Sequence, residues 1–301
     1  PLRVSQNGIF LLGPTIMEYG TDEQKERFLK PMAAGDEIWA QAWSEPGAGS
    51  DMAAIRSKAV RDGDAYVITG QKIWSSRAVF ADWCFGLFRT DPESSRHHGL
   101  SKILVPLDSP GLTVRPIAQL DGDPGFAELF FDEVRVPVDN LLGPEHGGWG
   151  VAMATAGFER GLLLRSPARF QAAAARLVKL YKQNANRLSS GIKEQVLQAW
   201  GDTERFTAAT YALVAQVDSG ASISSEASAN KIFWSEMDRA MHRTAMTIMG
   251  MHAELEEGEG AIENGRWLGG YMFSLAGPIY AGTNEIQRNI LAERVLGLPR
   301  Q

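Results

Sequence analysis

The chain carries two patterns of hydrophobic and polar positions, one after the other. Between about residues 38 and 140, short runs of β-branched and aromatic residues are separated by turns that contain Gly, Pro and Asp. The clearest runs are residues 65–69, 83–89, 102–107, 112–117 and 127–131. Regular short strands with no helical segment between them predict an antiparallel β-barrel or sandwich.

A helical period replaces this pattern after about residue 150. Two sets of apolar residues recur there at helical spacing, namely Ala173, Leu177, Leu180 and Tyr181, and then Val196, Trp200, Phe206 and Tyr211. Nine of the 14 prolines lie between residues 31 and 144, and only Pro167 falls between 145 and 277. Because proline breaks helix interiors, the second part can form long helices and the first cannot. We therefore expect a helical bundle after the β domain.

Helices are also expected at both ends of the chain. Residues 21–24 (Thr-Asp-Glu-Gln) form a capping box that opens a helix over residues 23–29, which Pro31 and Gly35 end. A final helix is expected to begin near residues 282–284 and to run to Leu296, before Gly297 and Pro299. The sequence thus predicts an α+β chain with a short N-terminal helical remnant (1–37), a β domain (38–145) and a helical bundle (146–301).

Composition excludes several classes of protein. The 301 residues are 44% hydrophobic and 22% charged, which is typical of a globular protein with a buried core. A formal net charge of −6 argues against a nucleic-acid partner, and no apolar run is long enough to predict a membrane span. Cys84 is the only cysteine, so an internal disulfide is impossible and a reducing, cytoplasmic location is expected.

Two further expectations come from features that the sequence lacks. The chain starts at Pro1 with neither a Met nor a signal-peptide pattern, which predicts a fragment or a trimmed product. His242 and His252 lack ligand spacing with any Cys or carboxylate cluster, and no metal site is expected.

The segment from Trp43 to Asp51 (W-S-E-P-G-A-G-S-D) is the most specific in the chain. Small residues and hydroxyls in a loop leave backbone N–H groups free to approach a ligand closely. From chemistry alone, a ligand-binding loop and an ordinary turn are equally open.

Four other segments accompany this one in a fixed order: Y-G-T-D-E-Q-K (19–25), G-Q-K-I-W-S-S (70–76), F-D-E-V-R-V-P (131–137) and I-Y-A-G-T-N-E-I-Q-R (279–288). With them the chain resembles the acyl-CoA dehydrogenase family, whose middle-domain signature is close to T-E-P-x-A-G-S-D. The resemblance implies an N-terminal helical domain, a middle β domain and a C-terminal four-helix bundle. Residues 1 to about 37 correspond only to the end of the first of these domains.

The resemblance implies an enzyme that uses FAD to convert an acyl-CoA thioester into a trans-2-enoyl-CoA. A carboxylate takes the α-proton, and FAD accepts hydride from the β-carbon. The implied cofactor-binding residues are Trp43, Ser44, Ser50, Trp74, Ser76, Thr283 and Glu285. The implied substrate-binding residues are Ser50, Arg160, Tyr280 and Ala281. Electron-transfer flavoprotein as electron acceptor and a homotetramer or heterotetramer are implied as partners.

Simpler interpretations remain open for two of these residues. A Trp in a strand, such as Trp74, is more often a core aromatic than a ligand contact. Thr283 precedes an expected helix, where it could bind a ligand or serve only as the N-cap.

The position of the catalytic base departs from the usual pattern of the family. Most members carry a Glu where this chain has Ala281, which cannot accept a proton. A minority place the carboxylate before an Arg on the helix that follows the β domain, and Glu159-Arg160 stand there. Apolar neighbours such as Phe158 would desolvate Glu159 and raise its pKa toward that of a useful base. A surface Glu that pairs along the helix is the alternative.

Two family segments that contact FAD are altered. The R-x-x-F-G segment has no clear match near residues 182–190, and Q-x-x-G-G-x-G is reduced to T-I-M-G-M (247–251). These changes favour a second hypothesis, in which the chain is a catalytically silent or partly catalytic partner subunit. A flavin monooxygenase or oxidase on the same fold is a third.

Overall fold

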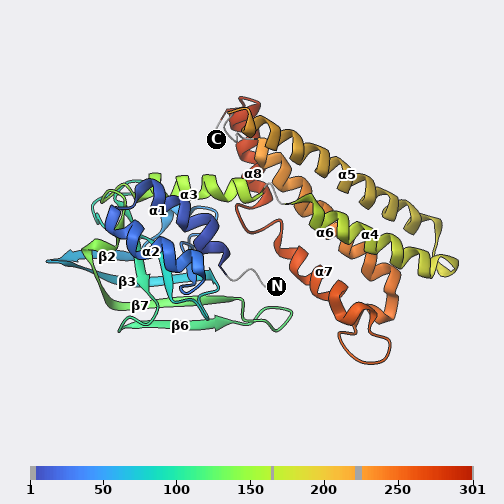
Figure 1. Cartoon of the computed structure of the whole chain (residues 1–301), viewed down its shortest axis with the longest axis horizontal. Helices are drawn as coiled ribbons and strands as arrows, with labels where there is room; N and C mark the ends of the chain where they lie inside the picture. Colours follow the sequence, from blue (N-terminus) through green and yellow to red (C-terminus); the bar gives the residue numbers. More distant parts are fainter. Residues whose placement is uncertain (1–4, 164–165, 221–225, 300–301) are drawn as a thin grey trace. The chain divides into compact units, whose positions relative to one another are not determined.

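The computed structural model describes residues 5–163, 166–220 and 226–299; the side chains of residues 159–163 and of Glu226 are outside the description. The chain forms two compact units, Pro1–Glu159 and Arg160–Gln301, which we describe separately. The first contains a β-sheet with short helices and the second contains long helices (Figure 1). The expected order of a short helical segment, a β domain and a helical domain is confirmed, while the three exact domain bounds remain predictions.

The first unit begins with three helical segments: η1 (Asn7–Leu12), α1 (Gly13–Tyr19) and α2 (Asp22–Ala34). The capping box at the start of α2 is confirmed, because Thr21 and Gln24 exchange two hydrogen bonds of 3.2 Å. The expectation that Pro31 ends this helix is wrong. Pro31 lies inside the last turn of α2, where it removes one N–H donor, and the helix ends at the left-handed Gly35 (φ 80°).

An eight-stranded sheet with the order β6-β7-β3-β2-β4-β5-β8 forms most of this unit, and β1 pairs with β4. The strands are β1 (Trp39–Ala42), β2 (Lys58–Asp62), β3 (Ala65–Ser76), β4 (Trp83–Arg89), β5 (Leu100–Pro106), β6 (Leu112–Ile117), β7 (Phe126–Pro137) and β8 (Leu141–Leu142). Most neighbours are antiparallel, as expected, but β1 and β2 run parallel to β4. A mixed sheet results, because β1 and β2 reach β4 through connections rather than through hairpins.

The core of the sheet is aliphatic and aromatic, and includes Ile68, Phe88, Val105 and Leu129. Strands β3 and β7 pair along nearly their whole length and extend well beyond the apolar runs that predicted them. The long partner strand, rather than local hydrophobicity, therefore determines where each of these two strands ends.

The remaining α-helices are α3 (Gly148–Leu163), α4 (Pro167–Asn184), α5 (Ser190–Asp218), α6 (Glu226–Met249), α7 (Arg266–Ala276) and α8 (Asn284–Ile290). Helices α4 to α8 belong to the second unit, whose core includes Phe170, Leu177, Phe206, Trp234 and Trp267. None of the described helices is long and apolar enough to cross a membrane.

Two residues expected in the helical core are instead at the surface. Trp200 and Tyr211 on α5 are 44% and 62% exposed, whereas Val196 and Phe206 of the same set are buried. At 100° per residue, both exposed side chains fall beside the buried row of α5 rather than in it. The expected face of α4 is confirmed, because Ala173, Leu177 and Leu180 are buried and Tyr181 packs against the same core.

Candidate functional site

The loop that follows β1 contains the most specific segment of the sequence. Glu45 and Ala48 close a tight turn through two backbone hydrogen bonds of 3.0 and 3.1 Å. At Gly47 and Gly49, an added Cβ would meet no atom within 4 Å, so the backbone here faces open space. A flat ligand can therefore approach the N–H groups of this loop closely.

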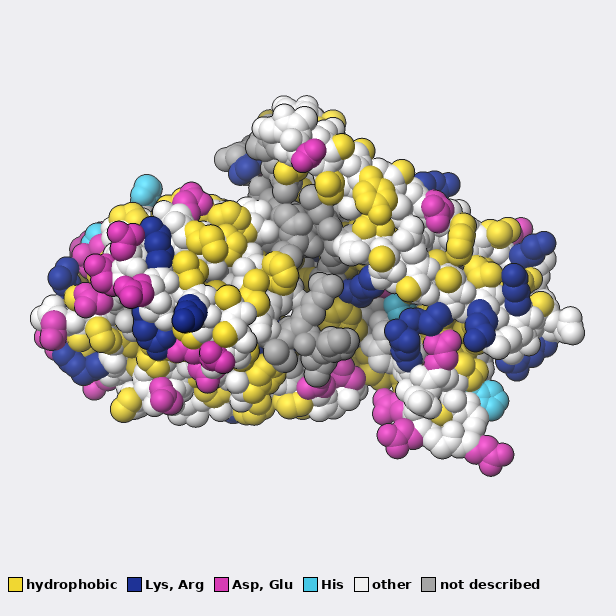
Figure 2. Space-filling view, in the orientation of Figure 1, with side chains coloured by type: hydrophobic (Ala, Val, Ile, Leu, Met, Phe, Trp, Pro, Cys, Tyr) yellow, Lys and Arg dark blue, Asp and Glu magenta, His cyan; other side chains and the backbone are white. Residues whose placement is uncertain are grey.

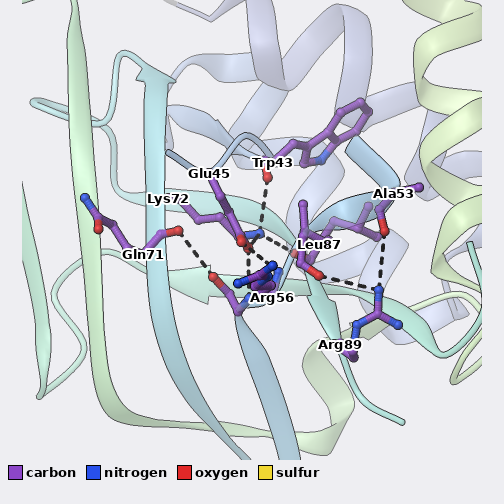
Figure 3. A network of polar contacts seen from close by, with 10 residues as sticks. Trp43, Glu45, Ala53, Arg56, Gln71, Lys72, Leu87 and Arg89 are labelled. Atoms are coloured by element: carbon purple, nitrogen blue, oxygen red, sulfur yellow. Dashed lines mark hydrogen bonds and ion pairs between the residues drawn. The ribbon is translucent and has the colours of Figure 1, made fainter. Parts of the chain in front are cut away.

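A buried ion pair holds the loop against the sheet (Figure 3). Lys72 of β3 is fully buried, and its Nζ donates to Glu45 Oε1 at 2.8 Å. The same ammonium donates to the carbonyl oxygens of Leu87 (2.7 Å) and Trp43 (3.2 Å). Lys72 thus satisfies its three donors and fixes both ends of the Trp43–Glu45 segment.

Backbone donors complete the surroundings of Glu45. The Arg56 N–H donates to Oε2 at 2.7 Å, and the Ser57 N–H donates to Oε1 at 2.9 Å. Burial alone would raise the pKa of Glu45, but Lys72 and these hydrogen bonds together lower it below its ordinary value. The carboxylate therefore contributes stability above its ordinary pKa of 4.5, and this contribution is lost as the pH falls through the lower pKa of the folded state.

Burial lowers the pKa of Lys72 to about 8, although Glu45 favours its charged form. The pair therefore depends on both partners, since a charge left alone in this interior would be poorly solvated. Sequence inspection missed this role of Lys72. A Lys inside a strand is ordinarily read as exposed, and only the alternation of buried positions in β3 could have revealed it.

Directly after Lys72, a bulge in β3 turns Trp74 outward. The register with β7 shifts between Lys72 and Ser75, and Trp74 adopts a left-handed backbone with φ 58°. The indole is 56% exposed and touches Phe126 edge-on at 6.1 Å between ring centroids. A bulky residue at positive φ is strained, and such strain is concentrated at functional sites. Trp74 is therefore not an ordinary core aromatic.

The structure brings four of the expected cofactor-binding residues together in the first unit. The Ile73 N–H, next to Trp74, donates to the Ser44 carbonyl at 2.9 Å, so the loop and the end of β3 lie side by side. Ser76 ends the same strand and is half-buried. Trp43 is buried, and its Nε1 has no hydrogen-bond partner among the described residues. Ser50 is exposed at the far end of the loop.

The expected site residues of the second unit gather around the start of α8. Thr283 is the N-cap, and its Oγ1 accepts from the Ile286 N–H at 3.2 Å. The two preceding residues are left-handed, Ala281 with φ 54° and Gly282 with φ 76°. The Ala281 carbonyl accepts from Gln287 Nε2 at 3.0 Å, which closes the turn over the helix.

Buried polar contacts fix this turn to α6. Asn284 is buried, and its Oδ1 accepts from Lys231 Nζ at 2.9 Å. Its Nδ2 donates to Glu236 Oε1, also at 2.9 Å. The hydrogen bond from the Ile286 N–H confirms the N-cap role of Thr283, while its expected contact with a ligand stays a prediction.

The remaining expected residues differ in how far the structure describes them. Tyr280 packs beside Trp234 and Phe273, with centroids 6.0 and 6.2 Å apart. Glu285 is exposed and pairs with Arg288 at 3.5 Å. The backbone of Glu159 and Arg160 belongs to α3, but their side chains lie outside the described residues. Their roles as base and substrate contact stay predictions.

The candidate residues of the first unit fit a flat aromatic cofactor with a polar edge. The exposed indole of Trp74 offers a face for stacking, and the open space over Gly47 and Gly49 admits a ring close to the backbone. Ser44 and Ser76 of the same unit carry hydroxyls that could hydrogen-bond to its edge. In a flavoprotein, these side chains and the 43–51 loop would hold FAD.

Comparison with known families agrees with this chemistry. The description "Acyl-CoA dehydrogenase, middle domain" matches residues 40–134, and "Acyl-CoA dehydrogenase, C-terminal domain" matches residues 146–296. The chain belongs to the acyl-CoA dehydrogenase family. It is therefore an oxidoreductase of lipid metabolism that depends on FAD.

Particular relatives cover nearly the whole chain. Acyl-CoA dehydrogenase IpdE1 of Mycobacterium tuberculosis is 41% identical over an alignment of 302 positions, which covers all of this chain and 77% of the relative. The solved structure "Tcur3481-Tcur3483 steroid ACAD" has a TM-score of 0.93 at 30% identity, covering 99% of this chain and 77% of that one. The "ChsE4-ChsE5 complex from Mycobacterium tuberculosis" has a TM-score of 0.87 at 33% identity, covering 99% and 78%.

Replacing Lys72 tests the buried ion pair. We expect Lys72→Met to lower the free energy of unfolding by about 3–5 kcal/mol, because Glu45 would remain buried without its counter-charge. Urea denaturation measures the change. The control is Arg135→Met, whose ion pair with Asp62 is more than half exposed and is expected to contribute less than about 1 kcal/mol. Equal losses in the two variants would contradict the role given to Lys72.

Replacing Trp74 tests its part in cofactor binding. We expect Trp74→Ala to weaken FAD binding by about 10-fold, through lost ring stacking, and to leave the thermal stability of the apoprotein nearly unchanged. Titration of the apoprotein with FAD, followed by flavin fluorescence, measures the affinity. Phe80→Ala is the matched control, because Phe80 is similarly exposed at 52% but lies outside the candidate site. The same loss of affinity in both variants would remove Trp74 from the site.

Proposed function

We propose that this chain catalyses α,β-dehydrogenation of an acyl-CoA thioester with Glu159 as the α-proton base. The observation that carries the proposal is Ala281, which stands where most relatives have their catalytic Glu. A methyl group cannot accept a proton, so the carboxylate must come from another element. The family places it alternatively before an Arg on the helix after the β domain, and Glu159-Arg160 of α3 occupy that position.

The helical register of α3 supports this assignment. Val151 and Thr155 are buried on one row of the helix, and Glu159 is the next position of the same i, i+4 row.

In the reaction, the Glu159 carboxylate removes the α-proton, and the electrons of the broken C–H bond form the new double bond. When bound, FAD is the acceptor for the hydride that leaves the β-carbon. The thioester oxygen gains negative charge as the proton leaves and requires a hydrogen-bond donor. The Ala281 backbone N–H, which has no acceptor in the described part of the chain, is the donor that we propose.

We further propose a bulky acyl group as substrate, with electron-transfer flavoprotein as the electron acceptor. The support for the acyl group is the likeness to a solved protein described as a steroid ACAD, at a TM-score of 0.93. Substrates to compare are the CoA thioester of a steroid carboxylic acid and butyryl-CoA, each with an artificial electron acceptor.

Replacing Glu159 by Gln tests the base. We expect kcat to fall by about 10²–10⁴-fold, the usual contribution of a general base, with FAD binding and thermal stability unchanged. Anaerobic flavin bleaching by the better of the two thioesters measures the reaction. Glu204→Gln, at an exposed position of α5, serves as the control and should keep full activity.

Two measurements separate the alternative functions: oxygen consumption by Glu159→Gln, and FAD binding by the wild-type chain with and without a second subunit. Full activity of Glu159→Gln together with oxygen consumption would favour a monooxygenase or oxidase. If the wild-type chain bound no FAD until a second subunit was added, the chain would be a partner subunit.

We also propose that the chain works as an oligomer of acyl-CoA dehydrogenase subunits. Figure 2 shows hydrophobic side chains at the surface of the helical unit. On α5, Leu197, Trp200 and Tyr211 share one exposed face. Large apolar groups along one face are typical of a subunit contact. Support for two kinds of subunit comes from the similar structure described as the ChsE4-ChsE5 complex.

Introducing charge on α5 tests this contact. We expect the double variant Trp200→Glu, Tyr211→Glu to lower the mass measured by light scattering toward the 32.9 kDa of one chain, because an unpaired carboxylate cannot be buried between subunits. Val60→Glu, at an exposed apolar position of β2, is the control. An unchanged mass in the α5 variant would exclude this face from the contact.

A further inference from the structure

Lys102 on β5 is a lysine that the interior of the first unit encloses completely. Its side chain has no exposed surface, and it forms no ion pair with any described carboxylate. Its Nζ donates to Thr155 Oγ1 at 2.6 Å. The same nitrogen lies 4.9 Å from the ring centre of Phe85 and 5.6 Å from that of Trp43.

Such a residue is costly in a folded protein. An ammonium without a counter-charge loses its hydration on burial, and burial lowers the pKa of Lys102 well below its ordinary value. An apolar side chain of similar length would fill the space without this cost. Buried ionisable groups of this kind are concentrated at functional sites, so the contacts of the Lys102 amine indicate which site it serves.

The hydroxyl of Thr155 connects Lys102 to two helices. Thr155 lies on α3, is buried, and its Oγ1 is 2.9 Å from both the Val151 carbonyl oxygen and Thr15 Oγ1, so its single proton serves one of these two acceptors. Thr15 Oγ1 in turn donates to the Leu11 carbonyl at 2.7 Å. When Thr155 donates to Thr15, a continuous series of hydrogen bonds joins β5 to α3 and to α1, and hydrogen bonds of this kind are directional.

Two of the three neighbours of the amine, Thr155 and Trp43, lie on segments that carry proposed site residues. Thr155 stands four residues, about one helical turn, before Glu159 on α3. Trp43 belongs to the loop that would lie along the flavin, and Lys102 approaches the face of its indole. A single side chain thus contacts the segment that carries the base and the segment that would carry the cofactor.

We propose that Lys102 is a positioning residue, which holds α3 in place through Thr155 and orients the indole of Trp43. The inference rests on the proposed function, because its purpose is to place Glu159 beside the substrate. Lys102 itself touches neither substrate nor cofactor in this proposal. The hydrogen bond fixes the rotation of α3 about its axis, which apolar packing alone specifies less sharply.

Four variants separate positioning from simple stability. Lys102→Met and Thr155→Val each remove one partner of the hydrogen bond at similar volume, and the double variant removes both. Thr155→Ser keeps the hydroxyl and is the conservative control. Thr155→Val removes the hydrogen-bond acceptor that the structure describes for the buried Lys102 amine, whereas Lys102→Met leaves Thr155 its contacts with Val151 and Thr15. Loss of both partners can be nearly neutral for stability.

We expect the double variant to unfold near the wild-type temperature and yet to show a kcat reduced by about 10- to 100-fold, the usual effect of a small misplacement, with KM within about twofold. Amide hydrogen exchange of residues 151–158 should be faster than in the wild type. Thr155→Ser should keep wild-type kcat and exchange. The assay uses the FAD-loaded protein with the thioester that the wild type oxidises faster.

Wild-type kcat and exchange in the double variant would overturn the proposal, and so would a Thr155→Ser variant as impaired as Thr155→Val. If the double variant unfolds at a lower temperature, the proposal is still tested by comparing kcat and hydrogen exchange of Thr155→Ser with those of Thr155→Val. Failure of the proposed function is a separate result, namely a wild-type protein inactive on both thioesters. In that case, the exchange of residues 151–158 alone tests whether Lys102 holds α3.

Discussion

The buried contact between Glu45 and Lys72 is the interaction on which the candidate site of the first unit depends. The 43–51 loop is rich in glycine and has few apolar side chains of its own, so hydrophobic packing cannot fix its course. The ion pair does so instead, since Lys72 binds the loop at Trp43 and Glu45 and is satisfied on its third donor by Leu87. Because both charges are removed from water, each partner requires the other.

The strand that carries Lys72 also has an unusual backbone. Immediately after Lys72 the strand bulges, and Trp74 takes a left-handed conformation that leaves its indole exposed. An isolated strand would relax this strain, but the pairing of β3 with β7 on both sides of the bulge maintains it. The strain and the exposed aromatic surface are consistent with preorganisation for a flat ligand. The same logic applies in the second unit, where left-handed Ala281 and Gly282 precede a helix fixed by buried Asn284.

The sequence predicted much of the fold and only part of the site. The motif around Glu45 and the Gly-Thr-Asn turn at 282–284 could be identified because glycine, hydroxyl and capping chemistry are local. The roles of Lys72 and Lys102 could not, because a lysine in a strand is ordinarily exposed and its partners are distant in sequence: 27 residues separate Lys72 from Glu45 and 53 separate Lys102 from Thr155.

By itself, the sequence determined the order of elements, the capping of α2 and α8, and the membership of the family, since these follow from propensity, periodicity and short motifs. It also determined that position 281 cannot supply a base. Only the tertiary structure decided the extent of β3 and β7, the outward position of Trp74, and the surface position of Trp200 and Tyr211. The reason is physical: strand length, burial and the pairing of buried charges depend on neighbours that the fold, and not the local chain, brings into contact.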